Sequence, residues 1–556
     1  MNSEQKYIAI SAAGIPRSKP KMIDSLEAIR FGIQSKYRIP FKKIILGILG
    51  FIGAIIILLI TNPHGAGMTP DSVAYISAAR NLVEGDGLLT YNGLHLVVQP
   101  PLYSILLAVI KKLTLVDPQI AAGYVNAILF GSIIYLSGLL LLRYLKSFVL
   151  IILGTASVII SYALVQASFM ALSELLFIFL VLLFLYHFGK YQIKRDFVSL
   201  FLFSTSVSLA CLTRYTGVII ILTGVLCIVF FTENRKKEKF WHSVIFLLIT
   251  LLPITLWVIR NYFISGTLTG LRASSSYTLF ENISFFYYTV LSWYFPLNLA
   301  GIYFVFIFLI VSTWALFGRT PAKFSIGEVF KLIGPSLIFI VTYSGIIIVS
   351  STTTAYDKIS DRLLSPIYIP FLFALFFLAD KILQWLRKNI HLESVTSLFV
   401  TGIILMMIFP AKKTIRAAEE FTELTGWGFS SYEWRENKTI EYLNQHKLFE
   451  KNYKFYSNEP EAVYILTGLT TKCSPPKRFY NSWQLFDIEG NPKETWEYGE
   501  DVCLVWLDNS TRNYLFTVNE LQKHIKMTEV VHLKDGEIYT FSIHQREFVQ
   551  FMFKAD

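Results

Sequence analysis

Charged residues are scarce in this sequence. Of its 556 residues, 16% are Asp, Glu, Lys or Arg and 54% are hydrophobic, and the mean hydropathy is +0.51. A soluble domain carries about a quarter charged residues, so this composition argues against a soluble protein and indicates a polytopic membrane protein. The formal net charge of +11 does not indicate nucleic-acid binding. Its lysines and arginines form short clusters between apolar runs, as charges that set membrane topology do.

Cysteine is also rare, and familiar catalytic motifs are missing. Four cysteines cannot form a disulfide framework, although Cys473 and Cys503 could pair if their part of the chain faces an oxidising space. The sequence contains no H-E-x-x-H, G-x-x-x-x-G-K-[ST], G-x-S-x-G or C-x-x-C motif. With no ATP-binding motif, the energy for any reaction must be stored in the substrate.

Long apolar runs predict about eleven transmembrane helices. We expect spans at residues 43–61, 121–142, 148–165, 175–188, 197–212, 218–231, 244–259, 297–317, 332–349, 364–379 and 395–409. The apolar stretch 102–113 is too short to span a bilayer, so we expect it to be interfacial or re-entrant.

The distribution of basic residues predicts the orientation. With 102–113 left out, the basic clusters fall on the side of the N-terminal segment 1–42. We therefore expect this segment to be cytoplasmic and the protein to be a multi-pass protein of the bacterial inner membrane. Lys412, Lys413 and Arg416 do not fit this rule, because they follow the last predicted span on the outer side.

The composition changes near residue 411. We expect a membrane domain over 43–410, containing a first outer loop at 62–101, and an extracytoplasmic α/β domain over 411–556. Within the latter, the pattern predicts a helix near 438–449 and strands near 454–456, 502–507 and 538–541.

The first outer loop contains a helix-start signal. Thr69 can cap the helix, Pro70 suits its first position and Asp71 lies in its first turn, while Gly85 and Gly87 predict its end. This helix would fix Asp71 just outside the lipid, with Tyr75 one turn further on the same face. Asp71 could only stabilise the helix start, or it could act as general base for an acceptor hydroxyl.

Other ionisable residues fall at the outer ends of predicted spans or in outer loops. They are Glu174, Arg214, Arg260, Asp357, Asp361 and Arg362. Because ionisable groups at membrane depth are costly, their location on one side together with Asp71 suggests a shared site.

Each of these residues also has a simpler interpretation. Glu174 could stabilise a helix N-terminus, Arg260 could be an interfacial arginine, and Asp361 could pair with Arg362. Three arginines from separate spans at one depth would instead suit a lipid phosphate, which guanidinium groups bind in bidentate fashion. No cofactor is indicated. His64 and His95 flank the first outer loop, so a divalent metal site there stays an alternative.

Several short motifs resemble the GT-C glycosyltransferases, in particular the protein mannosyltransferases and the aminoarabinose transferase of lipid A, of glycosyltransferase family 39 type. The residues that carry the resemblance are Pro70-Asp71-Ser72, Tyr75, Gly85, Gly87, Gln99-Pro100-Pro101-Leu102-Tyr103, Ser173-Glu174-Leu175-Leu176-Phe177, Thr213-Arg214-Tyr215-Thr216-Gly217 and Arg362-Leu363-Leu364-Ser365-Pro366-Ile367-Tyr368. The resemblance covers residues 44–410. Members of the family often have Glu at the position of Ser72 and His at that of Gln99.

The resemblance implies inverting transfer of a monosaccharide from a polyprenyl-phosphate-linked donor to an acceptor hydroxyl of a lipid, glycan or protein, on the outer face of the membrane. In that scheme Asp71 is the general base and Glu174 assists it. Arg214, Arg260 and Arg362 would hold the donor phosphate, and Tyr75, Gln99 and Tyr103 would contact substrate.

Two other functions fit an outer cluster of charged residues. A transporter or flippase of lipid-linked sugars would use them to bind its cargo, but transporters usually show repeated halves and broken helices that meet near the midplane. A sensor or scaffold would explain the C-terminal domain but leaves Asp71 and Glu174 without a role.

Overall fold

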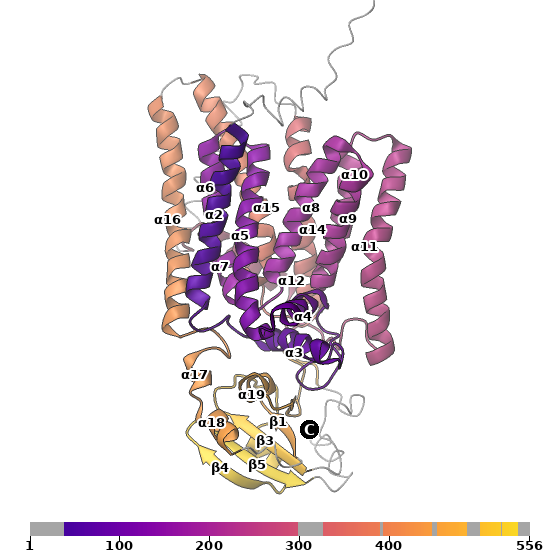
Figure 1. Ribbon diagram of the computed structural model, residues 1–556, viewed down its shortest axis with the longest axis vertical. Coiled ribbons are helices and arrows are strands. Elements are labelled where there is room, and N and C mark those ends of the chain that lie inside the picture. The colour runs from indigo at the N-terminus through magenta and orange to yellow at the C-terminus, as the bar shows by residue number, and fades with distance from the viewer. Residues whose placement is uncertain are drawn as a thin grey trace, which may run out of the picture. The chain divides into compact units, whose positions relative to one another are not determined.

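The computed structural model describes residues 38–297, 326–389, 393–446, 453–485, 501–523 and 525–542. Residues 1–45 form one unit, of which the structure describes only the start of helix α2 (Arg38–Thr61). Residues 46–556 form the second unit, and everything below concerns this second unit. Its long helices run roughly parallel to one another, and a small sheet contains the C-terminal strands (Figure 1).

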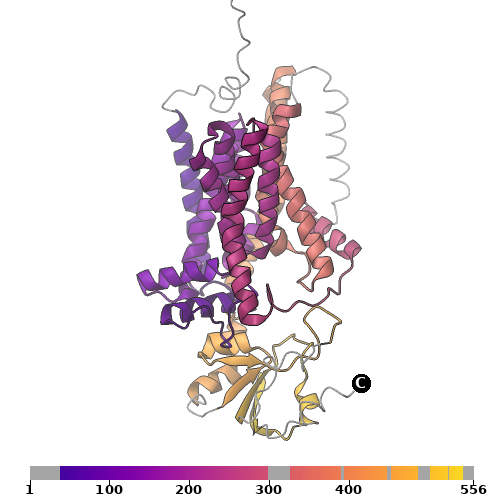
Figure 2. The ribbon, with the colours of Figure 1, turned by 90° about the vertical axis from the view of Figure 1, so that its right-hand side faces the viewer.

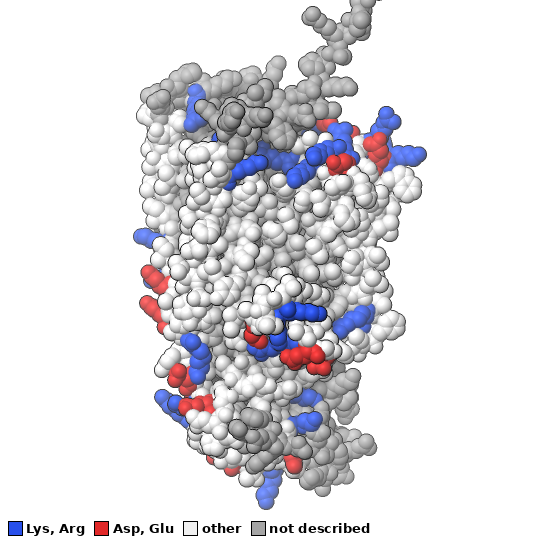
Figure 3. All heavy atoms as spheres, in the orientation of Figure 1, with Lys and Arg blue, Asp and Glu red and all other residues white. Residues whose placement is uncertain are grey.

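Seven helices of the described ranges are long and apolar enough to cross a membrane. They are α2, α5 (Pro118–Tyr144), α8 (Glu174–Lys194), α11 (Lys236–Ser265), α14 (Ile326–Thr353), α15 (Asp361–Asn389) and α16 (Glu393–Glu423). The bent pair α6 (Phe148–Ile159) and α7 (Tyr162–Phe169) would make an eighth span. The central band of the face in Figure 3 is almost free of charged side chains. The protein is therefore an integral membrane protein.

Each predicted span that lies in the described residues coincides with a helix, except 148–165, which covers the bent pair α6 and α7. The predictions at 197–212 and 218–231 correspond to the shorter apolar helices α9 (Phe197–Thr213) and α10 (Val218–Phe231). The predicted span 297–317 lies, apart from its first residue, outside the described residues, so the count of eleven stays a prediction. The apolar stretch 102–113 forms helix α4 (Leu102–Thr114), which has only 13 residues.

Helix α3 (Pro70–Glu84) starts and ends where its sequence signals predicted. Thr69 and Ser72 form a reciprocal capping box, Pro70 occupies the first turn, and Gly85 ends the helix in the left-handed conformation with φ of 100°. Helices α3 and α4 pack together and lie across one end of the long helices (Figures 1 and 2). Asp71 is thus presented from a rigid, well-capped element.

The C-terminal part forms a five-stranded mixed sheet of order β2-β1-β3-β5-β4. Its strands are β1 (Lys454–Ser457), β2 (Thr471–Cys473), β3 (Asp501–Leu507), β4 (Thr528–Leu533) and β5 (Gly536–Ser542). The three predicted strands and the helix predicted near 438–449, now α18 (Lys438–Gln445), are confirmed. Strands β2 and β4 and the short helices α19 (Pro460–Thr467) and α20 (Val518–Gln522) were not predicted.

Apolar side chains cover both faces of this sheet, because successive residues of a strand point to opposite sides. Tyr456, Leu504 and Phe541 pack with residues of α20 on one face. Residues Phe455, Val505 and Ile538 pack with residues of α18 and α19 on the other. The predicted α/β character of this part is therefore confirmed.

Cys473 and Cys503, for which the sequence left a disulfide open, are not bonded to each other. Cys473 lies on β2 and Cys503 on β3, and β1 runs between these two strands. Two strand spacings amount to about 9.5 Å, which exceeds the distance of about 7 Å that a disulfide tolerates between Cα atoms.

A short backbone bridge joins the start of α3 to the chain that follows α16. The Met68 amide donates to the Trp427 carbonyl at 3.0 Å, and the Phe429 amide donates to the Met68 carbonyl at 2.9 Å. Gly428 lies between them with φ of 62°, and a Cβ there would lie 1.9 Å from the Met68 oxygen. Glycine is therefore required at this position. Helix α16 itself continues to Glu423, so the domain boundary predicted at 410 falls within a helix.

Candidate active site

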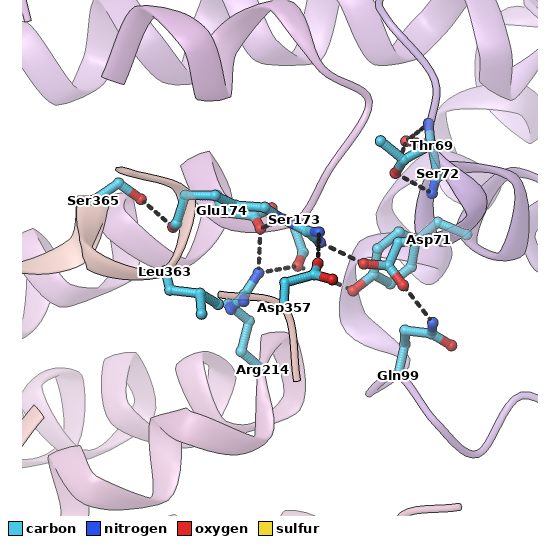
Figure 4. Close-up of polar contacts among 12 residues, drawn as sticks. Thr69, Asp71, Ser72, Gln99, Ser173, Glu174, Arg214, Asp357, Leu363 and Ser365 are labelled. Carbon is cyan, nitrogen blue, oxygen red and sulfur yellow. Dashed lines mark hydrogen bonds and ion pairs between the residues drawn. The ribbon is translucent and has the colours of Figure 1, made fainter. Parts of the chain in front are cut away.

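Asp71 lies opposite an arginine from a distant part of the chain. Its Oδ2 pairs with Nη2 of Arg362, which is in the first turn of α15. Its Oδ1 accepts a hydrogen bond of 3.0 Å from Gln99 Nε2 (Figure 4). The Asp71 side chain remains 37% exposed. The carboxylate is thus held on both oxygens but is still accessible to a substrate.

Burial by itself would raise the pKa of the Asp71 carboxyl, but the Arg362 guanidinium and the Gln99 amide outweigh it and lower that pKa below its ordinary value. Asp71 is therefore ionised at neutral pH, as a proton acceptor must be. The neighbouring Tyr75 hydroxyl has the opposite shift, since burial raises its pKa above the usual range. Tyr75 therefore stays neutral.

Glu174 is the second carboxylate of the site, at the start of α8, and its side chain is only 1% exposed. Its Oε1 pairs with Arg214 Nη1 at 2.7 Å and with Arg362 Nε at 2.7 Å. Its Oε2 is buried and has no hydrogen-bond partner in the described part of the chain. Glu174 therefore orients two guanidinium groups with one oxygen and leaves the other uncommitted.

Around this pair, the predicted residues from α3, α4 and the α9–α10 turn come together. The Tyr75 hydroxyl is 3.0 Å from Ser173 Oγ, and Arg214 Nη1 donates to the same oxygen at 3.5 Å. The rings of Tyr75 and Tyr103 pack edge to face at 5.1 Å. The structure thus places Asp71, Tyr75, Gln99, Tyr103, Glu174, Arg214 and Arg362 in one contiguous cluster.

Arg260 lies outside this cluster. Its Nη1 donates to the Leu96 carbonyl at 2.8 Å and to Asn261 Oδ1 at 3.0 Å, and its guanidinium lies 4.6 Å from the centre of the Trp257 ring. Arg260 therefore holds the end of the loop that follows α3, three residues before Gln99. Asp361 also points elsewhere: it accepts from Trp293 Nε1 at 2.7 Å and pairs with Lys413 at 3.8 Å.

The structure adds Tyr480 to the site and shows how Asp357, one of the ionisable residues expected to share it, takes part. Asp357 Oδ2 lies 3.7 Å from Arg362 Nη1, and its Oδ1 accepts a hydrogen bond of 2.8 Å from the Tyr480 hydroxyl of the C-terminal part. The sequence signal for the contact between Asp357 and Arg362 was that both are ionisable residues, close together in the chain, at the same predicted end of a span. Nothing in the sequence spacing links Tyr480 to it.

Among the residues that the structure describes, no group of three or more His, Cys, Asp or Glu side chains is arranged to hold a metal ion. Between Asp71 and Glu174 the positive charge is supplied by Arg362, which contacts both carboxylates. The cluster as described therefore balances its carboxylates with guanidinium groups.

Comparison with solved structures identifies the fold. ArnT from Cupriavidus metallidurans in the apo state superposes with a TM-score of 0.55 over 89% of this chain and 97% of that one, at 13% sequence identity. The chain has the GT-C fold. No family model and no curated protein sequence matches this chain. Its similarity to GT-C proteins is therefore one of fold.

Two further GT-C structures are similar at lower scores. ArnT bound to undecaprenyl phosphate aligns with a TM-score of 0.47 and 13% identity over 89% of this chain and 97% of that one. The archaeal oligosaccharyltransferase AglB from Archaeoglobus fulgidus, in complex with an inhibitory peptide and a dolichol-phosphate, aligns with a TM-score of 0.49 and 11% identity over 90% of this chain and 74% of that one.

Proposed function

We propose that this protein is an inverting membrane glycosyltransferase that moves a monosaccharide from a polyprenyl-phosphate-linked donor to an acceptor hydroxyl at the outer face of the membrane. The observation that carries this proposal is Asp71, an ionised and partly exposed carboxylate on a rigid helix at the end of the membrane helices, paired with Arg362. The GT-C fold is consistent with it.

In this mechanism, Asp71 accepts the proton of the acceptor hydroxyl as its oxygen attacks the anomeric carbon of the donor. The bond between that carbon and the phosphate oxygen breaks, and attack from the opposite face inverts the configuration. General base catalysis of this kind contributes roughly 10²- to 10⁴-fold to a rate.

Arg214 and Arg362 are the proposed ligands of the departing polyprenyl phosphate. Guanidinium groups match the oxygens of a phosphate, and both are oriented by Glu174 Oε1. Positive groups placed where charge develops in the transition state are usually the largest catalytic term. The polyprenyl tail would remain in the bilayer while its phosphate meets these arginines at the membrane boundary.

The test uses the full-length protein in nanodiscs with a panel of radiolabelled polyprenyl-phosphate sugars, comparing wild type with Asp71→Asn. We expect label to leave the lipid in wild type, to acceptor or to water, and the rate to fall by at least about 100-fold in the variant. Melting temperatures should match, because the side chain is 37% exposed.

Binding of a donor lipid without consumption, unchanged by Asp71→Asn, would instead support a transporter. Asp86→Asn is a suitable control, because Asp86 is an exposed acid just beyond the end of the same helix. If Asp71→Asn turned over the donor at the wild-type rate, Asp71 would not be the general base.

A further inference from the structure

A small hairpin of the C-terminal part approaches the candidate site. In residues 478–485, called here the 478–485 hairpin, Arg478 and Leu485 pair across the two arms. The Phe479 amide donates to the Gln484 carbonyl at 3.0 Å, and the Ser482 amide donates to the Phe479 carbonyl at 3.2 Å. Asn481 takes the left-handed conformation at the turn, with φ of 50°. The hairpin is thus a defined structure with its own hydrogen bonds.

This hairpin is fastened to the outer loops of the membrane helices at three points. The Tyr480 hydroxyl donates to Asp357 Oδ1 at 2.8 Å, and Asn481 Nδ2 donates to the Tyr356 carbonyl at 3.3 Å. The Ser274 amide donates to Gln484 Oε1 at 3.4 Å. Through Asp357, the hairpin is only two contacts away from Arg362.

The hairpin also carries an exposed aromatic ring. The Trp483 side chain is 78% exposed, and the Arg478 guanidinium lies 5.4 Å from its ring centre. A cation at this distance from an indole is attracted to the ring and helps to fix its orientation. An exposed indole paired with an arginine is a typical binding determinant, since Trp and Arg are enriched among residues that carry binding energy.

We propose that the 478–485 hairpin forms the acceptor side of the active site, with Tyr480 positioning it on Asp357 and the Trp483 indole stacking on a saccharide ring of the acceptor. This inference rests on the proposed transferase function. The occupant is a saccharide because the axial C–H face of a pyranose packs flat on an indole, while its hydroxyl groups need polar partners. The Arg478 guanidinium beside the ring carries hydrogen-bond donors of this kind.

The first experiment measures binding without catalysis. Saturation-transfer NMR would be recorded on the full-length protein in nanodiscs with methyl glucoside, galactoside and mannoside, because alkyl-glycoside detergents would compete. We expect saturation of pyranose C–H protons in wild type, loss of the signal in Trp483→Ala, and a partial signal in Trp483→Phe. The control Tyr432→Ala removes another exposed aromatic, 60% exposed, and should leave the signal intact.

The second experiment uses the same sugars as octyl glycosides in the transfer assay. Trp483→Ala should raise the acceptor KM by about tenfold, with kcat and the donor KM within twofold of wild type. Tyr480→Phe should lower kcat and shift the pH profile, because it loosens the aspartate beside Arg362.

The outcomes separate the two proposals. Equal glycoside signals in wild type and Trp483→Ala, no glycoside signal at all, or transfer only to a Ser/Thr peptide would overturn the hairpin proposal while leaving a transferase in place. Failure of the transferase proposal appears separately, as donor lipids that are never consumed and a variant Asp71→Asn that behaves as wild type.

Discussion

The described residues include two clusters of arginine and carboxylate side chains, one around Arg512 and one around Arg362. They differ in whether every carboxylate oxygen has a hydrogen-bond or ion-pair partner. In the C-terminal part, Arg512 pairs with Glu459 at 3.0 Å and with Glu461 at 2.6 Å. The Ser510 hydroxyl donates to the remaining oxygen of Glu459, and the Tyr91 hydroxyl donates to that of Glu461, both at 2.8 Å. All four carboxylate oxygens of this cluster therefore have partners.

The cluster around Asp71 has similar components but is left incomplete. Asp71 is partly exposed, and one oxygen of the buried Glu174 has no partner among the described residues. A completed network stabilises a structure, whereas an uncommitted buried acceptor at the edge of a membrane is available for a substrate.

The pKa shifts of the two clusters also point in opposite directions. Burial raises the pKa of Glu459 above its ordinary value, and the like charge of Glu461 adds to this, although Arg512 opposes both. At Asp71 the arginine outweighs burial and the pKa falls. Contact with an arginine is thus a poor guide to the function of a carboxylate. The exposure of its side chain and the presence of a partner on each of its oxygens are better guides.

Replacing the arginine of each cluster is expected to give the largest difference between them, in transfer rate for one and in stability for the other. Arg362→Met should reduce transfer by about 10³-fold, because it removes the charge shared by Asp71, Glu174 and the proposed phosphate. Initial rates at saturating donor would measure this, with the exposed Arg435→Met as control. Transfer within tenfold of wild type would show that the cluster does not act on the leaving group.

Arg512→Met should have the complementary effect on stability. Breaking a buried ion pair typically costs about 3–5 kcal/mol, because the remaining carboxylates lose their counter-charge. We expect a clearly lower melting temperature with turnover per folded molecule within about threefold of wild type. If Arg512→Met melts like wild type but loses transfer, the comparison between a structural and a functional cluster is wrong.

A smaller effect is expected from Gln99→Leu. Gln99 hydrogen bonds to the ionised form of Asp71 and lowers its pKa, so its removal should raise that pKa. The acid limb of the kcat/KM profile should then move to higher pH, and kcat/KM at neutral pH should fall by about fivefold, as expected for one lost hydrogen bond. A profile recorded from about pH 2.5 to 7 tests this, because the pKa of Asp71 is lowered below its ordinary value. An unchanged acid limb would show that this limb does not report the ionisation of Asp71.

The smallest effect concerns Arg260. As it holds the Leu96 carbonyl and does not contact Glu174, Arg260→Gln should change the donor KM by about twofold, whereas Arg214→Gln should raise it by about tenfold. Both constants come from one titration of the donor lipid. Equal increases would place Arg260 on the donor phosphate, as the sequence resemblance implied.

Hydropathy predicted the position of residues along the membrane normal, but not their rotation around it. It placed Arg260, Asp361 and Arg362 at one level, and it could not show which of them face each other. Successive residues of a helix point about 100° apart. Arg362 therefore meets Asp71 and Glu174, whereas Asp361 beside it points to Trp293 and Lys413.

Tertiary contacts also account for Lys413, one of the three basic residues that did not fit the charge rule. The prediction ended the last span at residue 409, because charged residues follow, but helix α16 continues to Glu423. On this extension Lys413 pairs with Asp361 and lies 4.0 Å from the centre of the Tyr162 ring. Its charge has local partners in the fold, which a count of lysines along the sequence cannot reveal.

The strands β2 and β4 were missed for another reason. Strand β2 has only three residues, and β4 lies at the edge of the sheet with mostly exposed side chains. Neither has the apolar run by which the other strands were recognised. The order of strands, which excludes the Cys473–Cys503 disulfide, depends on long-range pairing that local patterns do not contain.

The bridge between Met68 and Trp427 has a consequence for how this protein can be divided. The amide and carbonyl of one residue, immediately before the cap of α3, are held by backbone that lies more than 350 positions later in the chain. A truncated protein that ends after its last membrane helix would still contain Asp71 but would lose the two hydrogen bonds that fix the entry to its helix. Helix α3 and the C-terminal part therefore belong to one folding unit, and a recombinant protein that separates them would lose contacts on which both depend.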